Sequence, residues 1–212
     1  MSVKVKICGI NSIESMVASK GADYIGLVFY PKSPRFVNAE QAKEIIKYSY
    51  SNQKIVGLFV DTEDSVIEYI AEYVGLDFLQ FHGNETQKKI NYFKKKLRIP
   101  IIKSIPVSSY KDTQKFEDYK NICDMILFDS LPNNNILPGG SGEKFNWNFL
   151  KNFKCMDDWM LAGGINKHNL KEALRLTKAP IVDVSSGLET RKGLKSPKKI
   201  KEFLKIAKSM CL

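Results

Sequence analysis

The sequence predicts a single-domain α/β protein, a closed (β/α)8 barrel of the TIM-barrel type that spans residues 1–212. Eight short apolar runs alternate with amphipathic segments and start about 25 residues apart. Most of these runs are continuously apolar, as is typical of parallel strands buried on both faces. An open doubly wound sheet is the rival fold, but Cys8-Gly9-Ile10-Asn11 stands where a glycine-rich nucleotide fingerprint is expected.

The expected strands and helices follow from apolar runs and from capping residues. The strands are predicted at 3–8, 24–29, 55–60, 78–81, 101–105, 125–129, 159–162 and 181–184. Asn38 is expected to cap a helix over 39–48, and Asp61 with Thr62 to cap a helix that ends at Gly75. Ser196 followed by Pro197 is typical of an N-cap and the first helical residue.

Composition excludes several classes of protein. The chain is 43% hydrophobic and 26% charged, which is ordinary globular usage. It has no apolar run of about 18 residues and no long apolar core at its N-terminus, so neither a membrane span nor a secretory signal is expected. The cysteines are far apart and there are two histidines, so we expect no metal site, no disulfide framework and a cytoplasmic location. The four cysteines are Cys8, Cys123, Cys155 and Cys211.

The net charge is +10 and the sequence pI is about 9.3. Such a balance permits binding to nucleic acid, but only four of the 33 basic residues are arginine, the residue that reads bases and phosphates best. We therefore expect a solvated lysine-rich surface, with no nucleic-acid or membrane partner.

Candidate chemistry comes from the ends of the expected strands, because catalytic groups of parallel barrels sit at the carboxyl ends of the strands. Cys8 ends the first strand and could act as a base or nucleophile, or it could be a buried structural cysteine. Asp129 ends the sixth strand, where burial would raise its pKa and suit it to a general acid, although it could also cap a turn.

Two loops supply further candidates. Arg35 lies in a loop stiffened by Pro31 and Pro34, which suits a bidentate grip on a carboxylate, although a solvated arginine is equally consistent. His82 follows the fourth strand and could bind substrate or satisfy a loop carbonyl.

Glycines after neighbouring strands predict a phosphate site. Gly163 and Gly164 end the seventh strand, and Ser185-Ser186-Gly187 ends the eighth. Glycine lets backbone N–H groups approach a phosphate closely, and these two loops are a frequent phosphate site in such barrels. The run 139–142 after the sixth strand could close over a ligand.

Motifs in order along nearly the whole chain resemble the phosphoribosylanthranilate isomerase family of tryptophan biosynthesis. They are KICG at 6–9, GAD at 21–23, GLVFYPKSPR at 26–35, VGLFV at 56–60, LQFHGNE at 79–85, FDS at 128–130, GGSG at 139–142, LAGG at 161–164 and DVSSGLE at 183–189.

The resemblance implies a cofactor-free Amadori rearrangement of N-(5'-phosphoribosyl)anthranilate, carried out by a monomer or homodimer. By position, Cys8 would be the general base and Asp129 the general acid. Arg35 would hold the anthranilate carboxylate. The other implied substrate-binding residues are His82, Asp183, Gly140 and Gly142, with Gly163, Gly164, Ser185, Ser186 and Gly187 around the phosphate. Phe81 and Asn84 depart from the family's usual leucine and aspartate.

Two alternatives remain open at this point. The first is another phosphosugar barrel: a metal-dependent epimerase is disfavoured by the scarcity of histidine, whereas an indole-forming synthase could use Lys103 at the end of the fifth strand. The second is a basic nucleic-acid-binding protein, which a steep salt dependence of duplex binding would favour.

Overall fold

Eight parallel strands close into a barrel in the order β1 to β8, and β8 pairs with β1. The computed structural model describes residues 3–131, 144–151, 153 and 157–210. The barrel strands are β1 (Lys4–Cys8), β2 (Tyr24–Val28), β3 (Lys54–Phe59), β4 (Phe78–Phe81), β5 (Ile101–Val107), β6 (Met125–Ser130), β7 (Trp159–Leu161) and β8 (Ile181–Val184). The eight-stranded closed barrel is thereby confirmed, with strand ends that differ from prediction by at most two residues.

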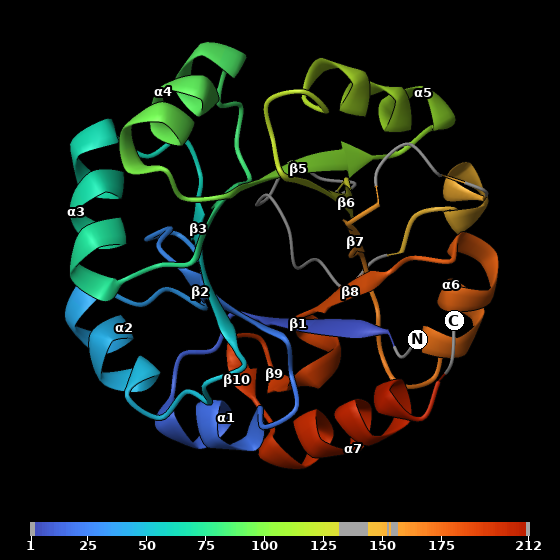
Figure 1. Cartoon of the computed structure of the whole chain (residues 1–212). Coiled ribbons are helices and arrows are strands. Elements are labelled where there is room, and N and C mark those ends of the chain that lie inside the picture. The colour runs from blue at the N-terminus through green and yellow to red at the C-terminus, as the bar shows by residue number, and fades with distance from the viewer. Residues whose placement is uncertain (1–2, 132–143, 152, 154–156, 211–212) are drawn as a thin grey trace.

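Helices surround the barrel (Figure 1). The α-helices are α1 (Ile13–Ala18), α2 (Ala39–Ile46), α3 (Asp64–Val74), α4 (Gln87–Leu97), α5 (Tyr110–Thr113), α6 (Leu170–Thr177) and α7 (Pro197–Lys208). Short 3-10 helices occur at η1 (Gln114–Asp118), η2 (Trp147–Leu150) and η3 (Ser186–Leu188). The described connection from β6 to β7 therefore contains a 3-10 turn.

Two apolar layers make up most of the described core. The larger joins outward strand residues such as Val5 and Ile7 to helix residues such as Met16 and Ile67. The smaller contains strand residues and Ala162, so it fills the barrel interior. Because side chains alternate along a strand, the positions of Lys6 and Cys8 share the inward face of β1.

Caps explain where the helices begin. Asn38 forms a full capping box with Gln41 at the start of α2, as predicted, although α2 ends two residues earlier than expected. Ser196 accepts from Lys199 N and Pro197 opens α7, which confirms that prediction. The predicted cap at Asp61 is wrong: α3 begins after Glu63, and Asp61 adopts a left-handed φ of 46° while its carboxylate accepts from Asn84 N.

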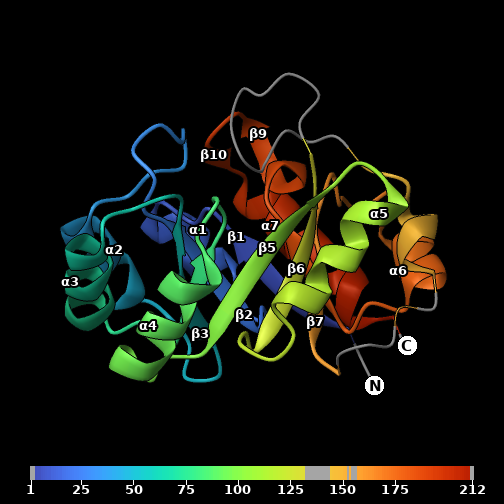
Figure 2. The same cartoon turned by 90° about the horizontal axis from the view of Figure 1, so that it is seen from above.

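A hairpin of β9 (Glu189–Arg191) and β10 (Leu194–Lys195) follows β8 and was not predicted. It lies at one end of the barrel (Figure 2). Gly193 allows it to pack against the loop after β2, because a Cβ there would lie 2.4 Å from the carbonyl oxygen of Pro34. The hairpin therefore covers the rim beside Arg35.

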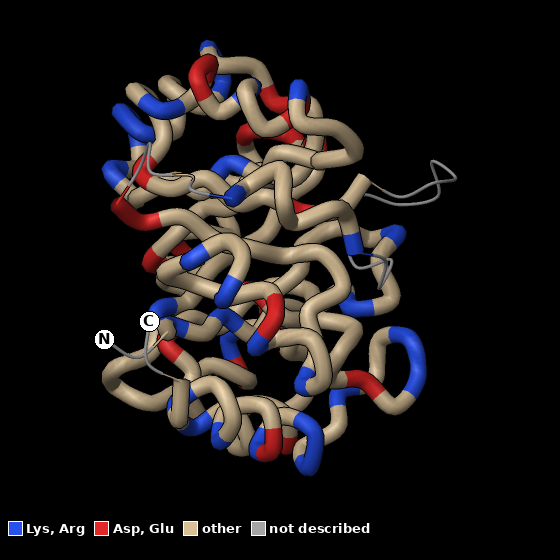
Figure 3. Tube along the Cα trace, turned by 90° about the vertical axis from the view of Figure 1, so that its right-hand side faces the viewer, with Lys and Arg blue, Asp and Glu red and all other residues tan. Residues whose placement is uncertain are grey.

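Positive and negative residues are interspersed along the chain on the face shown in Figure 3. Many lysines have acidic partners at the surface; Lys96 Nζ, for example, lies 2.7 Å from Glu68 Oε1. Among the described residues, no helix is long and apolar enough to cross a membrane.

The capping box of α2 gives a test of the local structure. Asn38→Ala should lower the free energy of unfolding by about 1 kcal/mol, because it leaves the backbone N–H of Gln41 without its side-chain acceptor. Glu63→Ala is the matched control, since Glu63 is an N-cap residue whose side chain makes no capping hydrogen bond. Denaturant unfolding measures both, and an equal loss in the two variants would contradict the assigned cap.

Candidate active site

Four of the predicted site residues lie together at the carboxyl end of the barrel: Cys8, His82, Asp129 and Asp183. Cys8 ends β1, Asp129 lies near the end of β6, and Asp183 lies near the end of β8. His82 directly follows β4, and its Nε2 lies 3.5 Å from Asp129 Oδ2. The structure therefore brings together the residues that the sequence predicted for the base, the acid and two substrate contacts.

Cys8 lies buried against the backbone of β2. A Cβ on Gly26 would lie 3.0 Å from the Cys8 sulfur, so glycine at this position leaves room for the thiol. Burial raises the pKa of Cys8 above its usual 9.0, and the charge of Lys6 opposes that rise more than any other group does. The free thiol is therefore mostly protonated at neutral pH.

Lys6 lies on the same strand, entirely shielded from solvent. Its Nζ lies 3.0 Å from Asp183 Oδ2, and the two residues are register partners across the β1–β8 seam. Burial favours the neutral amine, but the Asp183 carboxylate and the Cys8 sulfur outweigh burial and raise the pKa of Lys6 above 10.5. Asp183 Oδ1 is buried without a partner among the described residues, which suits it to receive a substrate hydroxyl.

Gln80 orients the ring of His82. Its Nε2 lies 3.0 Å from His82 Nδ1. With the amide donating to Nδ1, the neutral ring carries its proton on Nε2, the nitrogen that faces Asp129. Asp129 Oδ1 accepts from Ser130 N at 2.8 Å, so both carboxylate oxygens face a donor.

Arg35 is held in a buried charge cluster with the hairpin. Its Nε and Nη2 donate to the two oxygens of Glu189 at 2.7 and 3.0 Å, and Lys195 Nζ lies 2.7 Å from Glu189 Oε1. Burial alone would raise the pKa of Glu189, but Arg35 and Lys195 lower it to about 2. Arg35 also crosses Gly9, where a Cβ would lie 2.6 Å from its Cδ. It is thus a buried, oriented guanidinium at the rim rather than a solvated arginine.

The loops after β7 and β8 pack on each other. A Cβ on Gly187 would lie 2.2 Å from the carbonyl oxygen of Ile165. Gly163 and Gly164 have φ of 82° and 65°, and the carbonyl of Gly164 accepts from the side-chain amides of Asn166 and Asn169. Within the described ranges, the N–H groups of Gly163, Gly164, Ser186 and Gly187 have no protein acceptor. These donors are available to an anion.

Some predicted groups lie elsewhere. Gly140 and Gly142 fall outside the described residues. Lys103 is on the outward side of β5, with Ile101 and Ile105, and its Nζ pairs with Glu85 Oε2 at 3.0 Å. It cannot serve as a catalytic lysine in the barrel, which removes the sequence argument for a synthase. Among the described residues, no cluster of three His, Cys, Asp or Glu side chains could hold a metal.

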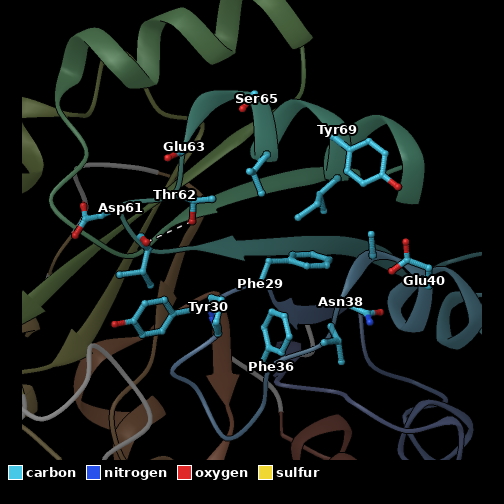
Figure 4. A pocket seen from close by; sticks show the side chains of 16 residues that line it. Phe29, Tyr30, Phe36, Asn38, Glu40, Asp61, Thr62, Glu63, Ser65 and Tyr69 are labelled. Atoms are coloured by element: carbon cyan, nitrogen blue, oxygen red, sulfur yellow. Dashed lines mark hydrogen bonds between the residues drawn. The ribbon is translucent and has the colours of Figure 1, made fainter.

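A cavity of about 700 Å³ lies outside this site. Its walls come from the loop after β2, the start of α2, the loop after β3 and α3 (Figure 4). No described member of the predicted site lines it, but two of its lining residues, Tyr30 and Val60, pack in one apolar cluster with Cys8.

Sequence reasoning missed Lys6, Gln80, Glu189 and Lys195. One signal was present for the first two: a polar residue stands two positions before Cys8 and before His82, so each pair shares one face of its strand. Glu189 and Lys195 offered no such signal, because their role depends on a hairpin that reaches Arg35 across 154 residues.

Comparison with known proteins identifies a family for this chain. The profile described as N-(5'-phosphoribosyl)anthranilate (PRA) isomerase matches residues 5–206. A protein of Paramagnetospirillum magneticum named N-(5'-phosphoribosyl)anthranilate isomerase is 40% identical over 211 residues, which cover 98% of each chain. The crystal structure of phosphoribosyl anthranilate isomerase from Thermotoga maritima is 33% identical, with a TM-score of 0.87 over 98% of this chain and all of that one.

A second solved structure holds a ligand. It is a phosphoribosyl anthranilate isomerase in complex with reduced 1-(o-carboxyphenylamino)-1-deoxyribulose 5-phosphate. It is 33% identical to this chain, with a TM-score of 0.85 over 98% of this chain and 100% of that chain.

The Arg35–Glu189–Lys195 cluster predicts a dependence of stability on pH. The pKa of Glu189 is about 2 in the folded chain and near 4.5 when unfolded, so its contribution is complete above pH 4.5 and is lost as the pH falls toward 2. Glu189→Gln should lower the free energy of unfolding at neutral pH by about 3–5 kcal/mol, because two buried cations lose their counter-charge. It should also flatten the acid limb. Urea unfolding across pH measures this, and an unchanged acid limb would contradict the prediction.

Proposed function

The chain belongs to the N-(5'-phosphoribosyl)anthranilate isomerase family, and on that basis we propose that Cys8 and Asp129 are the general base and general acid of its reaction. The enzyme converts N-(5'-phosphoribosyl)anthranilate to 1-(2-carboxyphenylamino)-1-deoxyribulose 5-phosphate in tryptophan biosynthesis. The observation that supports the two roles is the meeting of a thiol and a carboxylate from β1 and β6 at one rim, beside His82 and Asp183.

The first step opens the ribose ring. The nitrogen lone pair of the substrate forms a C1 iminium as the bond from C1 to the ring oxygen breaks, and protonated Asp129 gives its proton to that oxygen. The imidazole Nε2 of His82 lies 3.5 Å from Asp129 Oδ2, where it can orient the acid.

The second step moves the proton from C2. The iminium acidifies C2, and the Cys8 thiolate takes the proton to give an enolamine. The enolamine becomes the ketone when C1 gains a proton and the C2 hydroxyl loses one. In the same stage the Cys8 thiol gives up its proton and the Asp129 carboxylate regains one, so both groups return to their starting states. These steps move protons and electron pairs within one substrate, so the proposal requires no cofactor or metal.

Arg35 would bind the anthranilate carboxylate. Its guanidinium lies beside the end of β1, and the bidentate contact with Glu189 fixes its plane there. A planar cation with a fixed orientation suits a carboxylate better than a flexible one. Asp183 Oδ1 would accept from a sugar hydroxyl at the opposite side of the seam.

The phosphate would bind the backbone after β7 and β8. The N–H groups of Gly163, Gly164, Ser186 and Gly187 supply donors there, and Ser185 precedes them at the end of β8. Backbone donors of this kind are typical of anion sites in barrels.

A cytoplasmic location fits a soluble metabolite as substrate.

Loss of either proton-transfer group should stop the chemistry. Cys8→Ala and Asp129→Asn should each lower kcat by about 10²–10⁴-fold, or about 3–5 kcal/mol of barrier, with the fold retained. Cys8→Ser should also be poor, because a hydroxyl ionises far less readily than a thiol. A coupled fluorescence assay that follows the loss of phosphoribosylanthranilate measures kcat.

Cys123→Ala is the matched control, because Cys123 is the other cysteine in the described ranges and is buried on the outer side of the barrel. Near wild-type turnover by Cys8→Ala would remove the thiolate mechanism and leave Cys8 as a structural cysteine. A loss in Cys123→Ala as large as in Cys8→Ala would show that the assay reports on packing rather than chemistry.

The phosphate site predicts an effect on KM rather than on kcat. Gly164→Val should raise KM by about 10–100-fold, because a side chain at this positive φ moves a backbone donor away from the phosphate, and ground and transition states share that contact. Gly21→Val is the control: Gly21 also has a positive φ, 99°, but precedes β2 at the far end of the barrel. An equal rise of KM in both variants would assign the effect to backbone strain.

A further inference from the structure

The acid–base steps above leave one buried group of the site without a task. Lys6 is a fully buried lysine on the inward face of β1, two residues before Cys8. Its ammonium donates a hydrogen bond to Asp183 Oδ2 at 3.0 Å, and its position shares the inward face of β1 with that of Cys8. It lies below the rim, where it does not approach solvent.

The packing of the barrel does not require a charge at this level. Much of the inward layer is apolar, with Val56, Ile102, Leu127 and Met160 among its members. Taking two charges out of water costs several kcal/mol per ion, and apolar side chains of similar size often stabilise such a site equally well. The Lys6–Asp183 pair is therefore better explained by the electrostatic effect of the Lys6 ammonium on a neighbouring side chain.

Cys8 is the neighbour on which that charge acts. Three cations face it: Lys6 from β1, Arg35 from the loop after β2, and Lys195 from β10. Arg35 and Lys195 both pair with Glu189. Lys6 is the cation on the same strand and face as Cys8, and its charge lowers the pKa of that thiol more than any other group does.

The anions near this group oppose it. Asp183 faces Cys8 from β8, and Asp129 from β6 faces Asp183, as does the imidazole of His82 after β4. The Lys6 ammonium interacts electrostatically with both the Asp183 carboxylate and the Cys8 sulfur. The sulfur gains most of that stabilisation when it loses its proton.

We propose that Lys6 is a positioning residue of the reaction: its ammonium, held by Asp183, stabilises the Cys8 thiolate and keeps the sulfur at the rim. The inference rests on the proposed role of Cys8 as the base. It assigns to β1 both the sulfur that takes the proton and the cation that favours ionisation of that sulfur to the thiolate.

The direct test is a titration of Cys8 in the intact enzyme. Ultraviolet thiolate absorbance is followed against pH, and the same variant carrying Cys8→Ala is subtracted to remove the other cysteines and the tyrosines. Lys6→Met should raise the pKa of Cys8 by about 1–3 pH units, because the sulfur loses the cation that lowers its pKa most. Lys6→Arg, which keeps the charge, should restore most of the wild-type value.

Activity supplies a second readout that a structural role would not give. In Lys6→Met the acid limb of the pH profile of kcat/KM should move to higher pH by the same amount, a loss of about 10–1000-fold at neutral pH. If Lys6 only supported the fold, the plateau would fall while the limb stayed in place, and the inference would be overturned.

Lys6→Gln decides the matter if Lys6→Met does not fold. Its amide keeps a donor for Asp183 but carries no charge, so the pKa of Cys8 should rise as in Lys6→Met. An unchanged or lower pKa would overturn the inference. The outcomes distinguish the two proposals. An unchanged pKa of Cys8 in Lys6→Met would remove the role of Lys6 alone. An active Cys8→Ala enzyme would remove Cys8 as the base, and with it any role for Lys6 in the reaction.

Discussion

Closure of eight parallel strands determines which side chains share the rim. In a closed parallel sheet all carboxyl ends lie at one end, and each strand directs every second side chain inward. Cys8 on β1, Asp129 on β6 and Asp183 on β8 become neighbours for this reason, although 175 residues separate the first from the last. The apolar runs that build the sheet carry no chemistry themselves, but they fix the positions from which the chemistry is done.

The charges at the rim are arranged in two buried groups. Lys6 and Asp183 lie under Cys8, and Glu189 joins Arg35 to Lys195 beside it. Each group combines opposite charges, which limits the cost of burying them, and each leaves a cation near the sulfur. The mouth is thus suited to an anionic substrate and to an anionic sulfur while its own net charge stays small.

The sequence was informative where the signal is local. Apolar runs located the strands, Asn38 and Ser196 located two helix starts, and strand ends located Cys8 and Asp129. It failed where the answer depends on contacts between distant segments. Continuous apolar strands do not reveal which residues face inward, so Lys103 was a plausible catalytic lysine until its outward side was known. Lys6 was passed over for the same reason.

Both charged groups span the closing seam of the barrel. Lys6 pairs with a residue 177 positions later, and Arg35 with one 154 positions later. During synthesis on a ribosome, β1 and its cysteine emerge before their partners on β8 and the hairpin. A nascent chain that has already formed most of its strands therefore still holds a lysine and an arginine without counter-charges. The two ion pairs beside Cys8 can therefore form only after β8 and the hairpin have been made.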